Sequence, residues 1–247
     1  PASFDLCLTR CLARHSLEWW PENLPSDGPV EDNAARYKVE EAEYRRVLDE
    51  TADGVVVKLP NPEDGYAALA DRVTHLEQCE IEHLCGHMLA TLSIRQPVYA
   101  SELATKVIAN PDGPLAAEVR SLIEPLLSWN RQRARDLAGD AINSGNRALA
   151  MSIATTLGFS QWFEDCGEED VELLDTLLQS EEPSVFRQGL SALRQFGQTH
   201  PEDAIRKALT LEIGSDSQAA SAFVCIIDDK WGVPATSLEE SDWLGFL

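Results

Sequence analysis

An internal repeat is the feature that most constrains the fold of this chain. The run "VELLDTLLQSEEPSVFRQGLSALRQFG", from Val171 to Gly197, recurs as an apolar pattern 31 positions further on. In the first helix of each copy, Leu174, Leu177 and Leu178 correspond to Ile205, Ala208 and Leu209, and in the second, Ala192, Leu193 and Phe196 correspond to Phe223, Val224 and Ile227. Two short helices cannot bury their apolar faces alone, so the repeated units are expected to stack on one another.

A third unit precedes these two at a looser spacing. Leu137 corresponds to Leu174, and "RALAMSIATTLG" corresponds to "VFRQGLSALRQFG", with Gly158 aligned on Gly197. Each unit contains a helix, a turn and a second helix, and then a Gly, Asn or His-Pro breaker. We therefore predict an all-α fold of two-helix units stacked as an α-solenoid. The alternative is a helical bundle without repeats.

The first part of the chain is less regular. We predict a helix over about 3–17, a Pro-rich loop to about residue 32 and a charged helix after it. "GVVVKLPNP" is predicted to be an extended connector, and a long helix is predicted from Glu63 to Ile94. These features suggest three parts: residues 1–62 with N-terminal helices and loops, 63–128 with the long helix, and 129–247 with the repeats and a C-terminal cap.

The segment "EPSVFRQGLSALRQFG" (182–197) resembles the second helix of a short HEAT-like repeat. A turn residue precedes Val and Arg, small residues permit close helix packing, and Leu-x-x-Phe-Gly closes the helix. Residues 146–158 share part of this pattern, and 215–229 share less, because Gln218 replaces the Arg. The resemblance, over about residues 130–229, implies an α-solenoid that presents surfaces to other macromolecules. It implies no enzymatic activity.

The charge of the chain is strongly negative. Asp and Glu number 42 against 20 Lys and Arg, which gives a formal net charge of −22. Such a field repels nucleic acids and anionic membrane surfaces and favours basic partners, although acidity also serves solubility alone. Residues 164–182, the acidic segment, contain nine carboxylates and no basic residue. Its candidate partner-binding residues are Glu168, Glu169, Asp170, Glu172, Asp175, Glu181 and Glu182.

One basic cluster interrupts this acidity, in the run "WNRQRARD". Arg131 and Arg135 are four residues apart, so they share a helix face and could bind a phosphate or an acidic peptide. The alternative interpretation is that they pair with carboxylates of the same chain.

Histidines and cysteines gather in "HLEQCEIEHLCGHML" (75–89) and in "LCLTRCLARH" (6–15). Four-residue spacing places neighbouring pairs on one side of a helix, so the two helices together could hold a zinc ion. The candidate ligands are Cys11, His15, Cys79, His83 and His87. A line with this spacing drifts around the helix axis, so four residues of one helix cannot share an ion. The alternative is a structural helix with histidines at the edge of its buried face.

These observations predict a non-enzymatic scaffold, adaptor or neutralising protein that binds a basic protein surface, on its own or within a larger complex. We expect no bound cofactor, no direct nucleic-acid contact and no membrane contact. Six cysteines without the dense spacing of a disulfide framework indicate the cytoplasm. The alternative function is a metal- or thiol-dependent enzyme that uses the Cys and His residues near 7–15 and 75–87. The chain contains no GxSxG, P-loop, GxGxxG or HExxH motif.

Overall fold

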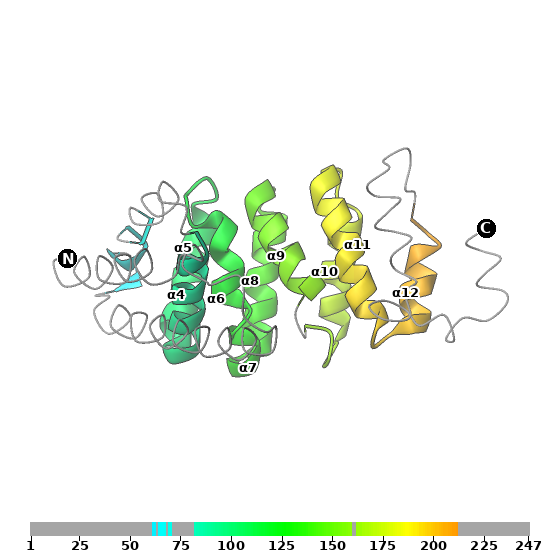
Figure 1. Cartoon of the computed structure of the whole chain (residues 1–247), viewed down its shortest axis with the longest axis horizontal. Helices are drawn as coiled ribbons and strands as arrows, with labels where there is room; N and C mark the ends of the chain where they lie inside the picture. Colours follow the sequence, from blue (N-terminus) through cyan, green and yellow to red (C-terminus); the bar gives the residue numbers. More distant parts are fainter. Residues whose placement is uncertain (1–60, 63, 68, 71–81, 160–161, 212–247) are drawn as a thin grey trace, which may run out of the picture.

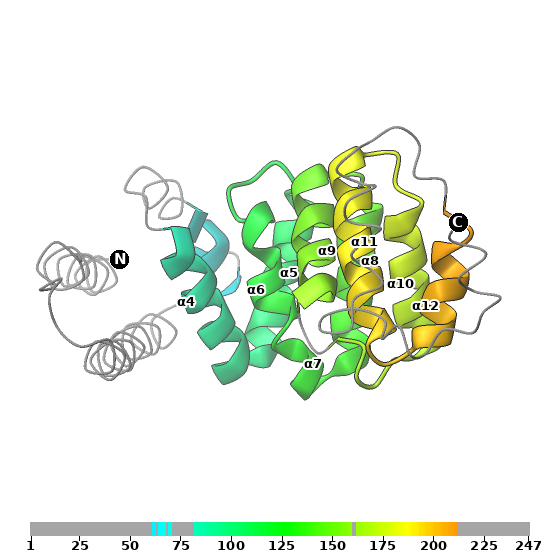
Figure 2. The same cartoon turned by 45° about the vertical axis from the view of Figure 1, so that its right-hand side comes forward.

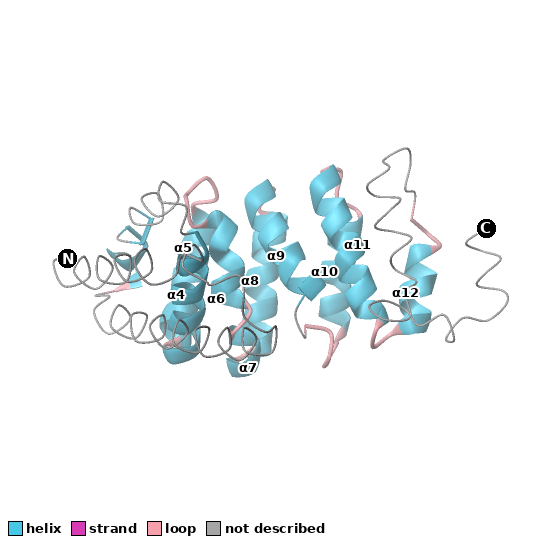
Figure 3. Cartoon of the chain, viewed as in Figure 1, coloured by secondary structure: helices cyan, strands magenta, loops and turns pink. Residues whose placement is uncertain are grey.

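The computed structural model describes residues 61–62, 64–67, 69–70, 82–159 and 162–211. Within these ranges all regular secondary structure is helical, which confirms the all-α prediction for this part of the chain (Figure 3). The helices are α4 (Glu82–Arg95), α5 (Pro97–Ala109), the 3₁₀ turn η2 (Ala116–Glu118), α6 (Val119–Ile123), α7 (Leu126–Trp129), α8 (Arg131–Asn143), α9 (Arg147–Phe159), α10 (Glu168–Leu178), α11 (Pro183–Gly197) and α12 (Pro201–Ala208). None of these helices has the length and apolarity that a membrane span requires.

The helices form two layers that run along the molecule (Figures 1 and 2). In one layer α5 packs on α8, and α8 packs on α10. In the other, α4, α6, α9 and α11 follow one another, and α9 and α11 share the most extensive contact in the described chain. Across the layers α5 faces α6, α8 faces α9 and α10 faces α11, while α12 continues beyond α11.

A single hydrophobic core fills the space between the layers. It runs without interruption from Leu69 to Ala208, and most of its members are Leu, Ala and Ile. In α8, Leu137, Ala138 and Ala141 are fully buried, and this spacing of three to four residues places them on one helix face. Helices on both sides of residue 128, such as α5 and α8, pack against each other, and the division of the chain into three parts stays a prediction.

Local sequence signals set the helix boundaries in the repeated region. The Asn130 side chain accepts a hydrogen bond from the backbone N–H of Arg133 and caps α8. Gly145 adopts a positive φ of 72° in the turn before α9, and the Asn146 side chain caps the first turn of that helix. Pro183 occupies the first turn of α11, where its missing N–H costs no helical hydrogen bond.

The apolar positions that define the repeat are buried wherever the structure describes them, with one exception. Leu174 and Leu177 are fully buried, and so are their counterparts Ile205 and Ala208. Leu209 is 41% exposed, because α12 ends one residue earlier. The positions aligned in 223–227 lie outside the described residues, as does almost all of the predicted 1–62 region.

The predicted long helix ends close to its expected position, since α4 ends at Arg95 rather than Ile94. Leu69, Met88 and Leu92 are buried, as expected for its core face, and His87 is half-buried.

Two glycines permit close helix contacts in the repeated region. A Cβ on Gly189 in α11 would lie 3.2 Å from the backbone carbonyl carbon of Leu177 in α10. A Cβ on Gly158 in α9 would lie 3.4 Å from the side chains of Gln188 and Ser191 in α11. Gly189 therefore lets α10 and α11 approach across the layers, and Gly158 lets α9 and α11 approach within one layer.

Candidate functional site

The acidic segment lies on the loop before α10, on α10 itself and on the turn into α11. Its seven predicted partner-binding residues differ widely in accessibility. Glu168, Glu169, Glu172 and Glu181 are exposed, and Asp175 and Glu182 are half-buried. Asp170 is fully buried and has no surface to offer a partner.

Asp170 instead organises the loop before α10. Its carboxylate accepts hydrogen bonds from the indole Nε1 of Trp162 at 2.7 Å, the backbone N–H of Gly167 at 2.8 Å and Nε of Arg135 at 2.9 Å. Nη2 of Arg135 also contacts the second Asp170 oxygen. The hydrogen bond to Asp170 raises the pKa of Arg135. Because Trp162 is fully buried, this network ties the loop to α8 from inside the core.

Arg131 joins the same cluster from one turn earlier in α8. Its Nη2 donates to the backbone carbonyl of Trp162 and lies 4.0 Å from an Asp170 oxygen. Nη1 lies 3.9 Å from the carboxylate of Asp165. Both predicted arginines thus face carboxylates of their own chain, which confirms the interpretation of intramolecular pairing. A role for them in binding an acidic partner stays a prediction.

Three further carboxylates of the segment have basic neighbours. Lys207 in α12 donates to both Asp175 oxygens, at 2.5 and 2.7 Å. Glu169 lies 3.3 Å from Arg135. Glu182 lies 3.5 Å from Arg147, and its pKa is lowered, first by the hydrogen bond from the Ser184 hydroxyl and then by nearby arginines.

Four exposed carboxylates remain: Glu164, Glu168, Glu172 and Glu181, which we name the acidic surface. None of them forms an ion pair or a side-chain hydrogen bond with a residue in the described ranges. Glu168 stands in the first turn of α10, where the positive end of the helix dipole favours a negative charge. Glu168 and Glu172 are one helical turn apart and repel each other, whereas Glu181 lies beyond the opposite end of α10.

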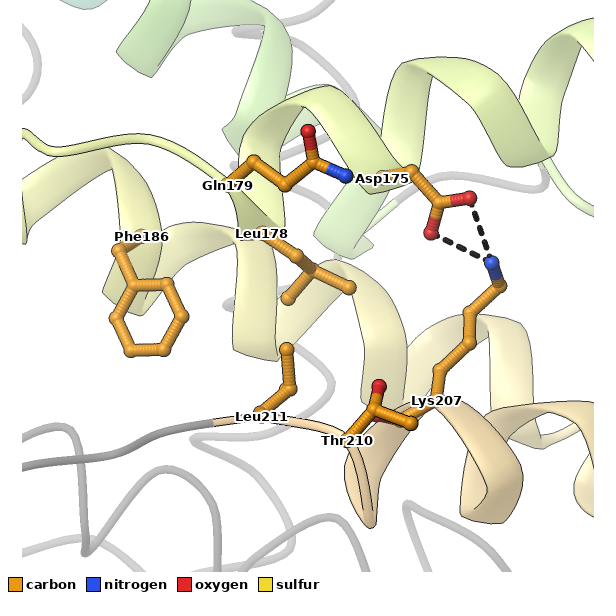
Figure 4. Close-up of a pocket in the computed structure, with 7 residues that line it drawn as sticks. All are labelled: Asp175, Leu178, Gln179, Phe186, Lys207, Thr210 and Leu211. Carbon is orange, nitrogen blue, oxygen red and sulfur yellow. Dashed lines mark hydrogen bonds and ion pairs between the residues drawn. The ribbon is translucent and has the colours of Figure 1, made fainter.

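A pocket of about 490 Å³ opens beside this surface, between α10, α11 and α12 (Figure 4). It is lined by Asp175, Leu178, Gln179, Phe186, Lys207, Thr210 and Leu211. The Asp175–Lys207 ion pair forms one wall, and the other carries Leu178, Phe186 and Leu211. The sequence interpretation missed every lining residue except Asp175, because the others come from three separate helices and one loop.

Cys166 lies at the base of the loop and is half-buried. Burial first, and then the nearby negative charge of Asp170, raises the pKa of its thiol to about 11. The thiol is therefore protonated at neutral pH, and a protonated thiol is a poor nucleophile.

The predicted zinc ligands lie largely beyond what the structure describes. Cys11, His15 and Cys79 are outside the described residues, and so is the side chain of His83. His87 is half-buried in α4. In the described part of the chain, no three His, Cys, Asp or Glu side chains are arranged to hold a metal ion. The zinc site stays a prediction that elemental analysis of the purified protein tests.

Comparison with known proteins gives no relative: no protein-family model, no curated protein and no solved structure matches this chain.

Proposed function

We propose that the chain is a short HEAT-like α-solenoid that acts in the cytoplasm as a non-enzymatic protein-binding scaffold. It recognises a basic surface of another protein through its acidic surface. The observation that carries the proposal is the set of four exposed carboxylates without a basic neighbour in the described residues.

The arrangement of the helices supports the solenoid part of the proposal. Each helix pair places one helix in each layer, and each pair contacts only its neighbours. The successive second helices α9 and α11 pack on each other, Gly158 of α9 lies against α11, and Gly189 of α11 lies against α10. Stacks of this kind expose long continuous surfaces, which suits the binding of another macromolecule.

The distribution of ion pairs supports the electrostatic part. The carboxylates with a structural task, above all Asp170, are buried or paired, so a partner gains little from them. The acidic surface has no such compensation within the described residues, and a cationic partner would supply attraction and relieve the repulsion between Glu168 and Glu172. Asp170 fixes the loop from which Glu164 and Glu168 extend, so these charges are held in place before a partner arrives.

A lysine-rich peptide with a neutral fluorophore tests the proposal by fluorescence anisotropy at low and high salt. We expect the triple variant E168Q/E172Q/E181Q to bind about tenfold more weakly at low salt, since each exposed pair contributes roughly 0.2–1 kcal/mol. The difference should shrink at high salt as the charges are screened. A pull-down from the native host, repeated at both salt concentrations, then identifies the natural partner.

The matched control is E102Q/D112N/E124Q, which removes the same charge from exposed positions before residue 130. This variant should bind the peptide almost as well as the wild type. Equal losses in the two triple variants would show that net charge alone attracts the peptide, and the acidic surface would then have no special role.

A further inference from the structure

The two helix layers differ in charge, although the chain as a whole has a net charge of −22. The helices α5, α8, α10 and α12 contain ten Asp and Glu residues. The three successive helices α6, α9 and α11 of the other layer contain none, but carry four arginines: Arg120, Arg147, Arg187 and Arg194. Carboxylates adjoin the ends of these three helices at Glu118, Glu124 and Glu182. Glu182 lies 3.5 Å from Arg147, and its pKa is lowered first by the hydrogen bond from Ser184 and then by Arg147 and Arg187.

One accessible stripe of α11, on the side that borders α9, is built largely from hydrogen-bond donors; its Ser184 hydroxyl accepts from Arg147, and its Ser191 lies beside Gly158 of α9. Ser184, Arg187, Ser191 and Arg194 recur every three to four residues and are all partly accessible, whereas the intervening Leu190 and Leu193 are fully buried in the core. Arg194 forms no hydrogen bond or ion pair with any residue in the described ranges.

The neighbouring helix α9 extends this surface (Figure 2). Its Arg147 side chain is 69% exposed, and Nε of Arg147 donates to the Ser184 hydroxyl at 3.0 Å, so the two helices meet at their N-terminal ends. Met151 and Thr155 continue the accessible side of α9 over the next two turns. We name Arg147, Arg187, Ser191 and Arg194 the arginine face.

We propose that the arginine face binds an acidic polypeptide segment of a partner protein, so that the molecule has two interaction surfaces of opposite charge. Guanidinium groups present fixed pairs of donors that match carboxylates. Arg187 and Arg194 stand two turns apart, which is about 10.5 Å along the helix axis. In a segment with polyproline II geometry, which has three residues per turn and a rise of about 3.1 Å per residue, carboxylates three residues apart lie on the same side and about 9 Å apart, so a Glu-x-x-Glu spacing fits the pair.

Charge considerations favour a polypeptide over a nucleic acid. A nucleic acid presents a continuous row of phosphates and depends on many simultaneous cationic contacts. Here four arginines lie on three helices of one layer, while the opposite layer, with ten acidic and six basic residues in α5, α8, α10 and α12, is net negative and repels a long polyanion. A short segment with two to four carboxylates stays within the arginine face, and charges more than about 8–10 Å away are screened at physiological salt.

The test uses the full chain and a rhodamine-labelled peptide of Glu-Gly-Gly-Glu repeats, measured by anisotropy at low salt. We expect R187Q/R194Q to weaken binding about tenfold, because two charge-assisted contacts are lost. R194E should abolish binding, and it is a safe variant since Arg194 has no bond within the described fold. The control R206Q removes a more exposed arginine, which pairs with Asp203 in α12, and should bind like the wild type.

Three outcomes would overturn the proposal. The peptide could fail to bind the wild-type chain, or it could bind R194E and R206Q equally. A decathymidylate that binds more tightly than the peptide, with the same dependence on Arg194, would assign the face to nucleic acid instead. The lysine-rich peptide should bind R187Q/R194Q at least as well as wild type, so failure of the arginine face and failure of the acidic surface give different results.

Discussion

At the residue scale, Asp170 is the one fully buried carboxylate among the described residues, and it accepts hydrogen bonds from Trp162, Gly167 and Arg135. Replacing Asp170 with Ala leaves the buried Trp162 indole N–H and the Arg135 guanidinium without their acceptor. Breaking a buried ion pair from one side typically costs 3–5 kcal/mol, and we expect a loss of about that size in the free energy of unfolding. Urea denaturation followed by circular dichroism measures it.

Glu172→Ala is the matched control, because Glu172 stands two residues further along the same helix and is exposed. It should change the free energy of unfolding by less than about 0.5 kcal/mol. If D170A and E172A unfold at the same urea concentration, the Asp170 network has no energetic importance.

The spacing of Asp170 along its helix indicates a buried residue, although the number of charges in the acidic segment suggested an exposed one. Asp170 precedes Leu173, Leu174 and Leu177 by three, four and seven residues, so it shares their buried helix face. Treating it as one more member of an acidic run placed it on the surface. Its partner could not be predicted, because Arg135 is 35 residues away and only the packing of α8 on α10 brings them together.

Cys166 gives a prediction about pH. Its raised pKa of about 11 means that the folded chain keeps the thiol proton at pH values where an unfolded chain loses it. The thiol therefore contributes stability that is complete below about pH 8.5 and is lost as pH rises toward 11. C166S should remove this part of the alkaline loss of stability, measured by urea denaturation from pH 8 to 11.

The rate at which iodoacetamide alkylates Cys166 is an independent test of the protonation of its thiol. Mass spectrometry of the peptide that contains Cys166 should show slow modification at pH 8 in the folded chain and faster modification in urea. Rapid modification of the folded chain at pH 8 would contradict the raised pKa.

At the scale of the elements, the atoms around a glycine decide whether an alanine at that position stabilises or destabilises the fold. Gly189→Ala places a methyl group 3.2–3.3 Å from the backbone and Cβ of Leu177, and backbone atoms cannot move aside easily. The resulting strain of about 1–3 kcal/mol should exceed the gain in helix propensity of about 1 kcal/mol. We expect a net fall in the free energy of unfolding.

Gly139→Ala is the contrasting variant in α8. Its new methyl group would meet only the Leu173 side chain, at an ordinary 3.6 Å. Helix propensity then dominates, and stability should rise by about 0.5–1 kcal/mol. Thermal unfolding of the two variants should shift in opposite directions. A rise for G189A would show that α10 and α11 can separate at little cost.

Helices in the repeat were predictable because their signals are local. The segments 146–158 and 182–197 agree with α9 (Arg147–Phe159) and α11 (Pro183–Gly197) to within a residue. Periodic apolar positions and a Pro or Asn at each start specify such helices without reference to the rest of the chain. The pocket was not predictable, since Asp175 and Lys207 meet across 32 residues and only through the packing of α12 beside α10.

At the scale of the whole molecule, the net charge does not show where the charged side chains lie or which of them are paired. Buried or paired carboxylates stabilise the fold, the acidic surface keeps its charges accessible, and the arginine face concentrates positive charge on the other layer. Under the two binding proposals above, a chain with this separation would hold two partners of opposite charge without bringing them into direct contact. Composition alone predicted the acidic surface but not the arginine face, because the arginine face depends on which helices share a layer.

The net charge also predicts how salt affects stability. A chain with 42 acidic and 20 basic residues repels itself when it folds, and added salt screens this repulsion more than it weakens a few exposed ion pairs. Raising NaCl from about 20 to about 200 mM should therefore raise Tm by about 2–4 °C, as expected for about 1 kcal/mol in a chain of this size. Differential scanning fluorimetry measures the shift, and E168Q/E172Q/E181Q should show a smaller one because part of the repulsion is already removed. A Tm that falls with salt would mean that exposed pairs such as Arg206–Asp203 outweigh the repulsion.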